Sequence, residues 1–435
     1  MSLSARGTYW RMRILVLNHN ITERGTYCRA FPFARHLAAR GHEVVFCCVH
    51  PVRMYRPTVT RIDVGEGRSL LRYEMPNWSG KQERQEGRGP IDIVRRSWLA
   101  LTRRFDVAWA FSHKFNAVIP ARIAQKLHGA TFISDWCDRW GGEEGLFEFA
   151  VLNSESFKQL PPDVQKTRRR AFAQEAVWEE KVRRVWADGV TVISRALYER
   201  TLGLGVPPSQ VLRIHSGANL EEIKPLDKTA CRRELGLSLP PDASVLGYVA
   251  NFHADEALFL DALERIVARD PAVRFVHCGA PFSTGAPDLK RRGVFDRFHY
   301  LGWVPIDTLP KVLGASDILM LPLSSRRLNV ERWPHKITDY LAAGRPVAAC
   351  DVGDVADLVR AGDSGRLGEP TAEGLAEATL YLLNRRDVWD AMGRRARQTA
   401  ESRLDWRRLG DAAMDFIIRV RETPRAAPRR ERGFR

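Results

Sequence analysis

Two acidic residues in the second half of the chain have side chains whose chemistry suits the binding of hydroxyl groups. Glu331 and Asp339 are separated by seven residues, and Arg332 and Lys336 lie between them. An ionised carboxylate accepts hydroxyl hydrogen bonds with charge-assisted strength, and a cation beside the amides of a helix N-terminus holds phosphate. The four residues therefore predict a site for a ligand with hydroxyl and phosphate groups. The plainer alternative is that they are solvated surface charges.

A second cluster combines acids with an aromatic ring. Residues 135–142 (DWCDRWGG) follow a predicted buried strand at 131–134, so Asp135 and Asp138 should project from the end of that strand. An aromatic face such as that of Trp136 packs against the C–H face of a sugar, while carboxylates bind its hydroxyl groups. We expect sugar contacts at Asp135 and Trp136 and a general base at Asp138. The alternative for either aspartate is a helix N-cap.

The loop after the first predicted strand offers two further candidates. Gly25 would permit close approach of the backbone to a ligand, and Arg29 could meet a phosphate. The loop contains no G-x-G-x-x-G, so it does not support dinucleotide binding. Gly25 is otherwise a simple turn glycine.

The elements that must position these residues alternate between strand and helix. A continuous apolar run predicts a buried strand over 13–17, helical spacing predicts a helix over 27–40, and a second apolar run predicts a strand over 43–49. This order is a βαβ unit. We expect surface excursions with a short strand over 56–90. The remaining predicted elements of this first series are strands at 107–110, 131–134 and 189–193, helices at 91–103 and 117–128, and a long amphipathic helical stretch over 153–187.

A second alternating series begins near Pro225. Two such series imply two doubly wound α/β domains, and open α/β sheets bind ligands beyond the carboxyl ends of their strands. We therefore expect the site in a cleft between two facing sheets. The second series consists of predicted strands at 244–249, 274–278, 298–301, 318–322 and 347–350 and helices at 254–269, 308–315, 335–343 and 373–383.

Composition indicates a soluble, cytoplasmic protein. The chain is 44% hydrophobic and 28% charged, and no apolar run approaches the length of a membrane span. Its start has no apolar core of a secretory signal. Seven scattered cysteines without a CxxC pair suit neither a disulfide framework nor a zinc site.

The net charge of +16 favours a polyanionic partner, such as a phosphate-bearing substrate or an anionic membrane surface. Part of it comes from residues 419–435, which contain seven arginines and are otherwise a solvated, disordered terminus. Nothing in the chain resembles a nucleic-acid module, so we expect no nucleic-acid partner.

Several short motifs, in order, resemble the glycosyltransferases of family 4 (group 1), which have the GT-B fold. Residues 334–347 (PHKITDYLAAGRPV) are similar to the donor-binding signature of that family. The other resembling segments are 24–29 (RGTYCR), 37–44 (LAARGHEV), 188–194 (DGVTVIS), 214–219 (IHSGAN), 301–304 (LGWV) and 309–322. The resemblance covers about residues 12–420 and is specific because the motifs recur in sequence order.

The resemblance implies two Rossmann-like domains and transfer of a sugar from a nucleotide-sugar donor to a saccharide or lipid-linked acceptor, as in polysaccharide biosynthesis. It implies retention of anomeric configuration, with no metal, no cofactor and no protein nucleophile. The leaving phosphate itself would deprotonate the acceptor, at the inner face of the membrane if that acceptor is lipid-linked. The expected domains are an acceptor domain at 1–222, a donor domain at 223–404, a helix at 405–420 that crosses back to the first domain, and a basic disordered tail at 421–435.

The resemblance also assigns roles to residues. The first acid of the spaced pair contacts the donor sugar, the second contacts the ribose, and a histidine after a strand of the first domain lies near the sugar or is a loop histidine without a role. The expected catalytic residues are His113, Asp138 and Glu331, the donor-binding residues are Gly25, Arg29, Asn251, Val304, Arg332, Lys336 and Asp339, and the acceptor contacts are Asp135 and Trp136.

One departure bears on the donor site. The family places an Arg or Lys and a second Lys after the first strand of the donor domain, but residues 247–255 (GYVANFHAD) contain neither. Either Lys336, Arg332, Arg326 or Arg327 takes their place, or donor binding is altered. The alternatives are a non-catalytic sugar- or anion-binding relative and a GT-B nucleotide-sugar epimerase.

Overall fold

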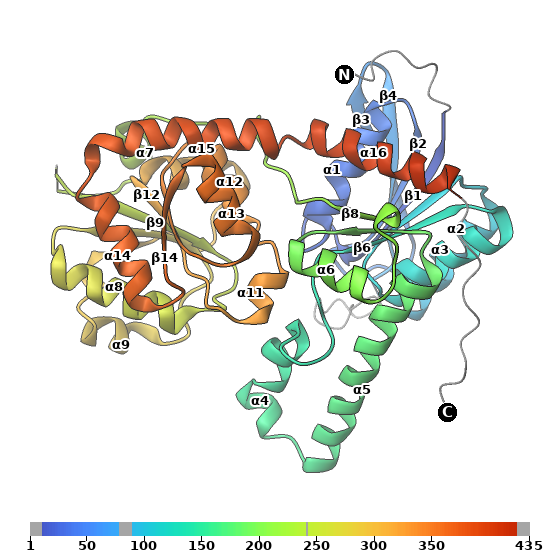
Figure 1. The fold of residues 1–435 in the computed structure, drawn as a ribbon, viewed down its shortest axis with the longest axis horizontal. Coiled ribbons are helices and arrows are strands. Elements are labelled where there is room, and N and C mark those ends of the chain that lie inside the picture. Colours follow the sequence, from blue (N-terminus) through green and yellow to red (C-terminus); the bar gives the residue numbers. More distant parts are fainter. Residues whose placement is uncertain (1–10, 78–88, 241, 424–435) are drawn as a thin grey trace. The chain divides into compact units, whose positions relative to one another are not determined.

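The computed structural model describes residues 11–77, 89–240 and 242–423 (Figure 1). The chain forms two compact units: unit 1 contains Met1–Ile214 and Trp406–Arg435, and unit 2 contains His215–Asp405. The first part of unit 1 ends at Ile214, eight residues before the domain boundary at 222 that the sequence suggested. The tail expected at 421–435 lies outside the described residues from 424 onward, and its first two residues belong to a helix.

Unit 1 contains an eight-stranded sheet in the order β3-β4-β2-β1-β5-β6-β7-β8, in which only the β3–β4 pair is antiparallel among the described strands. The central strands are buried on both faces, as their continuous apolar runs predict. The strands are β1 (Arg13–Ile21), β2 (Glu43–Val49), β3 (Thr58–Gly65), β4 (Arg68–Met75), β5 (Val107–Phe111), β6 (Thr131–Trp136), β7 (Gly189–Val192) and β8 (Val211–Arg213).

The helices of unit 1 come from both ends of its sequence. α1 packs on β1 and β2 and on α16, the helix at the end of the described chain. Phe33 of α1, Trp109 of β5 and Phe416 of α16 belong to one apolar core. The helices are α1 (Tyr27–Ala39), α2 (Pro90–Thr102), α3 (Phe115–His128), α4 (Glu155–Lys158), α5 (Pro162–Lys181), α6 (Arg195–Gly203) and α16 (Trp406–Glu422), with π-helical turns at Glu148–Leu152 and Val182–Trp186.

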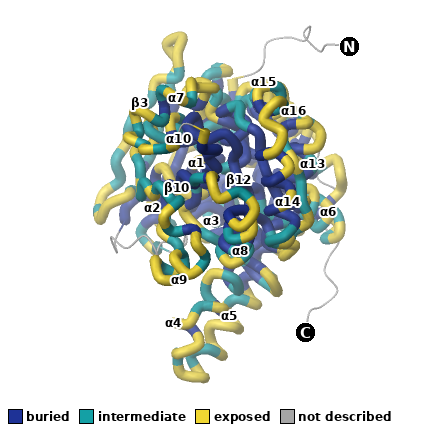
Figure 2. The backbone as a smooth tube through the Cα atoms, turned by 90° about the vertical axis from the view of Figure 1, so that its left-hand side faces the viewer, coloured by how far each residue is buried: buried dark blue, intermediate teal, exposed yellow. Residues whose placement is uncertain are grey.

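α4 and the outer part of α5 project from the rest of unit 1 as an arm (Figure 1). Most residues of this arm are exposed (Figure 2), including the basic run Lys166, Arg168, Arg169 and Arg170. Glu175 and Glu179, in the inner half of α5, are buried instead. One helix therefore has a solvated half and a half that belongs to the interior.

Unit 2 contains a six-stranded parallel sheet in the order β11-β10-β9-β12-β13-β14. Its strands are β9 (Val245–Ala250), β10 (Arg274–Gly279), β11 (Phe298–Tyr300), β12 (Ile318–Leu321), β13 (Val347–Cys350) and β14 (Gly365–Gly368). Its helices are α7 (Lys228–Glu234), α8 (Glu256–Arg269), α9 (Gly285–Arg291), α10 (Leu309–Ala315), α11 (Arg327–Glu331), α12 (Lys336–Ala342), α13 (Gly353–Gly362), α14 (Ala372–Leu383) and α15 (Trp389–Arg403).

Several elements differ from the sequence-based expectation. Residues 56–90 contain a hairpin of two strands, and β6 continues two residues beyond 134. Glu331 ends α11 and so does not lie in a loop. The edge strands β8 and β14 have only three and four residues, too short for an apolar run to stand out in the sequence.

Candidate functional site

In unit 2 the residues predicted to bind the donor gather beyond the carboxyl ends of the central strands. α12 is tied to β9 by a hydrogen bond that the Val249 backbone N–H donates to the Tyr340 hydroxyl, over 3.1 Å. This contact places Lys336, the first residue of α12, against β9, with Nζ 4.5 Å from the centre of the Tyr248 ring. The start of α12 thus lies beside β9, the strand that continues into the segment 251–255 where the family has its basic residues.

Two basic side chains lie next to the end of β9. Burial, together with the positive charge of Arg332, lowers the pKa of Lys336 to about 7, while Asp255 opposes this shift. Asp255 accepts a 2.8 Å hydrogen bond from the Asn329 amide of α11. The two exposed arginines Arg326 and Arg327 start that helix. Of the four proposed substitutes for the missing basic pair, Lys336 lies against the Tyr248 ring of β9, and the charge of Arg332 acts on both Lys336 and Tyr248.

The two acids of the spaced pair occupy different helices. Glu331 is the buried last residue of α11, and Asp339 is half-buried in the first turn of α12. Burial raises the pKa of Asp339 to about 7, against the effect of a hydrogen bond with Thr338. A basic and an acidic group thus flank one helix start, an arrangement able to hold a phosphate and a hydroxyl group.

Aromatic and histidine rings form a wall beside this helix start. His253 Nε2 and His277 Nε2 both lie within 2.9 Å of the Ala280 carbonyl oxygen. Phe282 stacks on His277, with ring centres 4.9 Å apart, and packs on His253 at 4.7 Å. The pKa of each histidine is lowered, chiefly by burial, so both rings favour the neutral form.

The remaining donor-side predictions lie on loops at the same edge. Asn251 is exposed directly after β9, and Val304 is half-buried in the loop after β11. That loop is held by the Gly279 N–H, which donates to the Gly302 carbonyl over 2.8 Å. Trp303 beside Val304 is 66% exposed and offers a free aromatic face that the sequence analysis did not single out.

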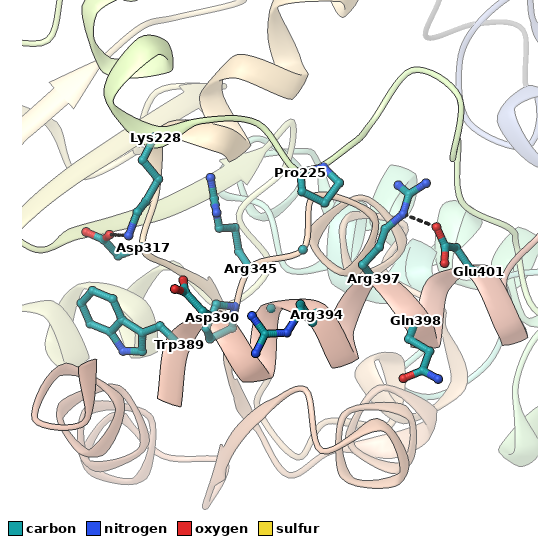
Figure 3. Close-up of a pocket in the computed structure, with 13 residues that line it drawn as sticks. Pro225, Lys228, Asp317, Arg345, Trp389, Asp390, Arg394, Arg397, Gln398 and Glu401 are labelled. Carbon is teal, nitrogen blue, oxygen red and sulfur yellow. Dashed lines mark hydrogen bonds and ion pairs between the residues drawn. The ribbon is translucent and has the colours of Figure 1, made fainter. Parts of the chain in front are cut away.

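A cavity of about 300 Å³ lies at the opposite, amino-terminal edge of this sheet (Figure 3). Lys228 pairs with Asp317, which precedes β12, and Arg397 pairs with Glu401 on α15. None of the residues predicted from the sequence to bind the donor lines this cavity.

In unit 1 the predicted acceptor contacts Asp135 and Trp136 are buried within β6, whereas we expected Asp135 to project beyond a strand that ends at 134. Both are the last residues of β6, and Asp135 is paired in register with β5 on one side and β7 on the other. Arg29 Nη2 lies 2.9 Å from Asp135 Oδ2, and Thr191 donates to the same oxygen over 2.7 Å. The Trp136 indole N–H donates to Glu179 over 2.7 Å. Arg29 and Asp135 thus form an internal ion pair.

His113 is also fully enclosed. Its Nε2 lies 2.7 Å from Glu175 Oε1, and its Nδ1 faces Glu179 Oε1 at 3.6 Å. Burial lowers the pKa of His113, while Glu179 and Glu175 raise it. Lys114 pairs with Glu175 and lies 4.3 Å from the centre of the Trp140 ring. Direct contact of His113 with a sugar, as predicted, would require these partners to separate.

Gly25 and Asp138 remain accessible at this edge of the unit 1 sheet. Gly25 is exposed with φ +56°, a conformation that favours glycine, and a Cβ there would require the Asn20 side chain to move. Asp138 is half-buried just after β6 and accepts a weak bond from the Cys137 thiol at 3.6 Å.

Sequence reasoning missed Glu175 and Glu179, which hold the edge of this sheet together. The Trp140 and Gly141 backbone N–H groups both donate to Glu179, over 3.2 and 3.1 Å. A signal was present, because both acids fall on the same helical stripe as Phe172. Acids on the apolar side of a helix indicate buried partners.

Among the described residues no three His, Cys, Asp or Glu side chains lie close enough together to hold a metal ion. None of the described helices is both long and apolar enough to cross a bilayer.

Two family descriptions match the chain. Residues 28–217 match the glycosyl transferase 4-like domain, and residues 243–385 match the glycosyl transferases of group 1. A D-inositol 3-phosphate glycosyltransferase of Geodermatophilus obscurus is 31% identical over 241 residues, which are 52% of this chain and 51% of that protein. The chain thus spans about half the length of the curated relatives it matches.

Solved structures match over nearly the whole chain. Sucrose-phosphate synthase from Thermosynechococcus elongatus has a TM-score of 0.70 at 16% identity, covering 94% of this chain and 99% of that one. Anabaena Alr3699/HepE in complex with UDP-glucose has a TM-score of 0.62 at 16% identity, covering 94% and 100%.

Proposed function

Because the chain belongs to the glycosyl transferases of group 1, we propose that it transfers a sugar from a nucleotide-sugar donor to a saccharide or lipid-linked acceptor. The fold class predicted from the sequence is confirmed, since both units are Rossmann-like α/β units and the solved structures alike in fold are GT-B enzymes. The observation that carries the proposal is the placement of Lys336 and Arg332 beside the end of β9.

In this proposal unit 2 binds the donor. Lys336 and Arg332 supply the positive charge that binds the diphosphate, a role that other members of the family give to basic residues after this strand. Asp339 accepts hydrogen bonds from ribose hydroxyls. Glu331 contacts the donor sugar. The exposed ring of Trp303, beside Val304, suits a nucleobase.

The proposed reaction is a hexosyl transfer that retains configuration. The leaving phosphate, held by the two cations, takes the acceptor proton on the same face of the sugar, so no protein nucleophile and no metal is needed. Asp138 of unit 1, half-buried beyond β6, is the protein group proposed to orient the acceptor hydroxyl by accepting a hydrogen bond from it. We place the reaction in the cytoplasm, at the inner face of the membrane where the acceptor is lipid-linked.

The test measures donor binding through the shift of the melting temperature that UDP-, GDP- and ADP-sugars each cause. We expect one nucleotide to stabilise the protein, and Glu331→Ala and Asp339→Ala to lose most of that stabilisation. Glu377→Ala is the matched control, because Glu377 is an exposed acid on α14. Slow hydrolysis of the stabilising donor would show that the chemistry is intact, and NMR of the transferred product reports its anomeric configuration.

The pH dependence of the same assay tests the two cations. The pKa of free Lys336 is about 7, and an anionic diphosphate favours its charged form, so donor stabilisation should weaken as the pH rises above 7. Lys336→Arg should retain stabilisation at high pH, whereas Lys336→Met should lose it throughout. Binding that is indifferent to both substitutions, or a wild-type protein that no donor stabilises, would refute the proposal.

A further inference from the structure

The outer surface of α2 is apolar in a way that the fold does not explain. Val94, Trp98 and Leu101 recur at helical spacing on one stripe and are 64%, 63% and 45% exposed. Leu127, on the last turn of α3, is 59% exposed. The two helix ends are neighbours, because His128 Nε2 lies 3.1 Å from the Ala100 carbonyl oxygen. The four residues, called here the α2 stripe, form one exposed apolar strip.

Basic residues frame the α2 stripe. Arg95, Arg103, Arg104 and Lys126 are all exposed. Within the part of the chain that the structure describes, none of Arg95, Arg104 and Lys126 pairs with a carboxylate, and Arg103 lies over the Tyr73 ring at 5.9 Å. The only acid in residues 90–104 or 120–130 is Asp92, which is buried and bonded to Arg96 and Asn116. Within the described residues of these two helices, the stripe is therefore apolar and the exposed charged residues beside it are positive.

Such a surface suits one kind of occupant. In a symmetric contact with a second copy, Arg95 of α2 and the adjoining Arg103 and Arg104 would be brought close to the same positive cluster on the other copy, which like-charge repulsion opposes. An anionic bilayer instead offers acyl chains to the stripe, an interface where tryptophan is favoured, and phosphate groups to the guanidinium groups. α2 has 13 residues, too few to span a bilayer, so the helix would lie in the interface plane.

We propose that unit 1 docks on anionic membranes through the α2 stripe and its framing arginines. The proposal goes beyond the transferase function and is independent of donor binding, because docking requires neither donor nor acceptor. The proposal names α2, and not α5, as the membrane-binding helix. Among the residues that the structure describes, the exposed basic run of α5 at 166–170 has no apolar stripe beside it.

The test is co-sedimentation of the full chain with vesicles. We compare neutral phosphatidylcholine vesicles with vesicles that also contain phosphatidylglycerol, at low and high salt. We expect binding to the anionic vesicles only, weakened by salt. The variant Arg95→Gln/Arg103→Gln/Arg104→Gln should lower the partition coefficient at least about tenfold. The variant Trp98→Ser/Leu101→Ser should lower it at least about fivefold, because interfacial apolar area is lost.

The matched control is Arg168→Gln/Arg169→Gln/Arg170→Gln on α5, which removes the same charge from another exposed helix of unit 1. It should bind like the wild type. Equal losses in both arginine variants, loss in the α5 variant alone, or a wild type that binds no anionic vesicle would overturn the proposal. Melting temperatures and the donor-induced shift should stay unchanged in the α2 variants, which separates failed docking from misfolding and from failure of the proposed transferase function.

Discussion

At the scale of single residues, α12 begins with two ionisable groups, one turn apart, whose pKa values converge on neutrality from opposite sides. Burial lowers the pKa of Lys336 and raises that of Asp339, each to about 7. Each side chain therefore resists its own charged form in the absence of a ligand. A ligand with phosphate and hydroxyl groups would supply the partners that restore both charges.

This arrangement implies a cost in stability at Asp339. Its folded pKa is raised above the unfolded value, so its contribution favours folding at low pH and is lost as the pH rises through 7. We expect Asp339→Asn to raise the free energy of unfolding at pH 8 by roughly 1–3 kcal/mol, a gain that shrinks as the pH falls toward 4. Urea unfolding across that pH range measures it. Glu377→Ala should show no such pH-dependent gain, and a gain independent of pH would point to packing instead of charge.

The residue types of the donor side were predictable from the sequence, and their environments were not. The motif at 334–347 located Lys336 and Asp339, but their burial depends on how α12 packs on β9. In unit 1 the same limit led to an error. Strand β6 ends two residues later than its apolar run suggests, so Asp135 and Trp136 became part of the sheet. Asp135 has a buried arginine as partner, and no local pattern in the sequence reveals a contact between residues 29 and 135.

At the scale of elements, the donor edge of unit 2 depends on how closely β9 and β10 end together. Gly279 has φ +113°, and a Cβ there would lie 2.1 Å from the Ala250 carbonyl oxygen. The neighbouring N–H of Ala280 donates to that same oxygen over 2.8 Å. A side chain at 279 would therefore push apart the two strand ends that present the histidine wall.

We expect Gly279→Ala to lower the free energy of unfolding by about 2–4 kcal/mol, from the sum of backbone strain and steric overlap. Gly293→Ala provides the matched control, because Gly293 has φ +67° with no atom near the added Cβ, and should cost only about 1 kcal/mol. Urea midpoints of the full-length proteins measure both. Equal losses would mean that strain alone matters and that the strand ends tolerate a side chain.

Alternation of apolar runs and helical spacing predicted most central elements of both sheets. The amphipathic pattern over 153–187 indicated one apolar stripe but not the division of α5 into a solvated arm and a buried half. The buried half is decided by partners from elsewhere, chiefly His113 and Lys114, which meet Glu175.

At the scale of the whole molecule, unit 1 is completed by a helix from the far end of the sequence. Phe416, Ile417 and Val420 of α16 are almost fully buried in the core of unit 1. Gly189 of β7 has no room for a side chain because Phe416 and Val420 lie within about 3 Å of its added Cβ. This helix belongs to unit 1 together with residues from the start of the sequence.

A chain truncated after Asp405 should lose the cooperative unfolding of unit 1. Burial of three such side chains contributes roughly 5–9 kcal/mol, comparable to the stability of a whole domain. Circular dichroism melts and limited proteolysis would report a protease-sensitive first half beside an intact unit 2. A chain ending at Thr423 is the control and should melt like the full protein, and an unchanged melt of the shorter chain would show that α16 is dispensable.

The return of α16 also sets the order in which a ribosome could deliver a finished protein. Residues 215–405 form one continuous unit, whereas unit 1 starts first and closes last. At about 5–20 residues per second, translating that intervening stretch takes roughly 10–40 s. Throughout that time the apolar surface that α16 later covers, around Phe33 and Trp109, stays exposed in the nascent chain. Unit 2 can therefore complete its fold before unit 1, and unit 1 has the greater need of a chaperone.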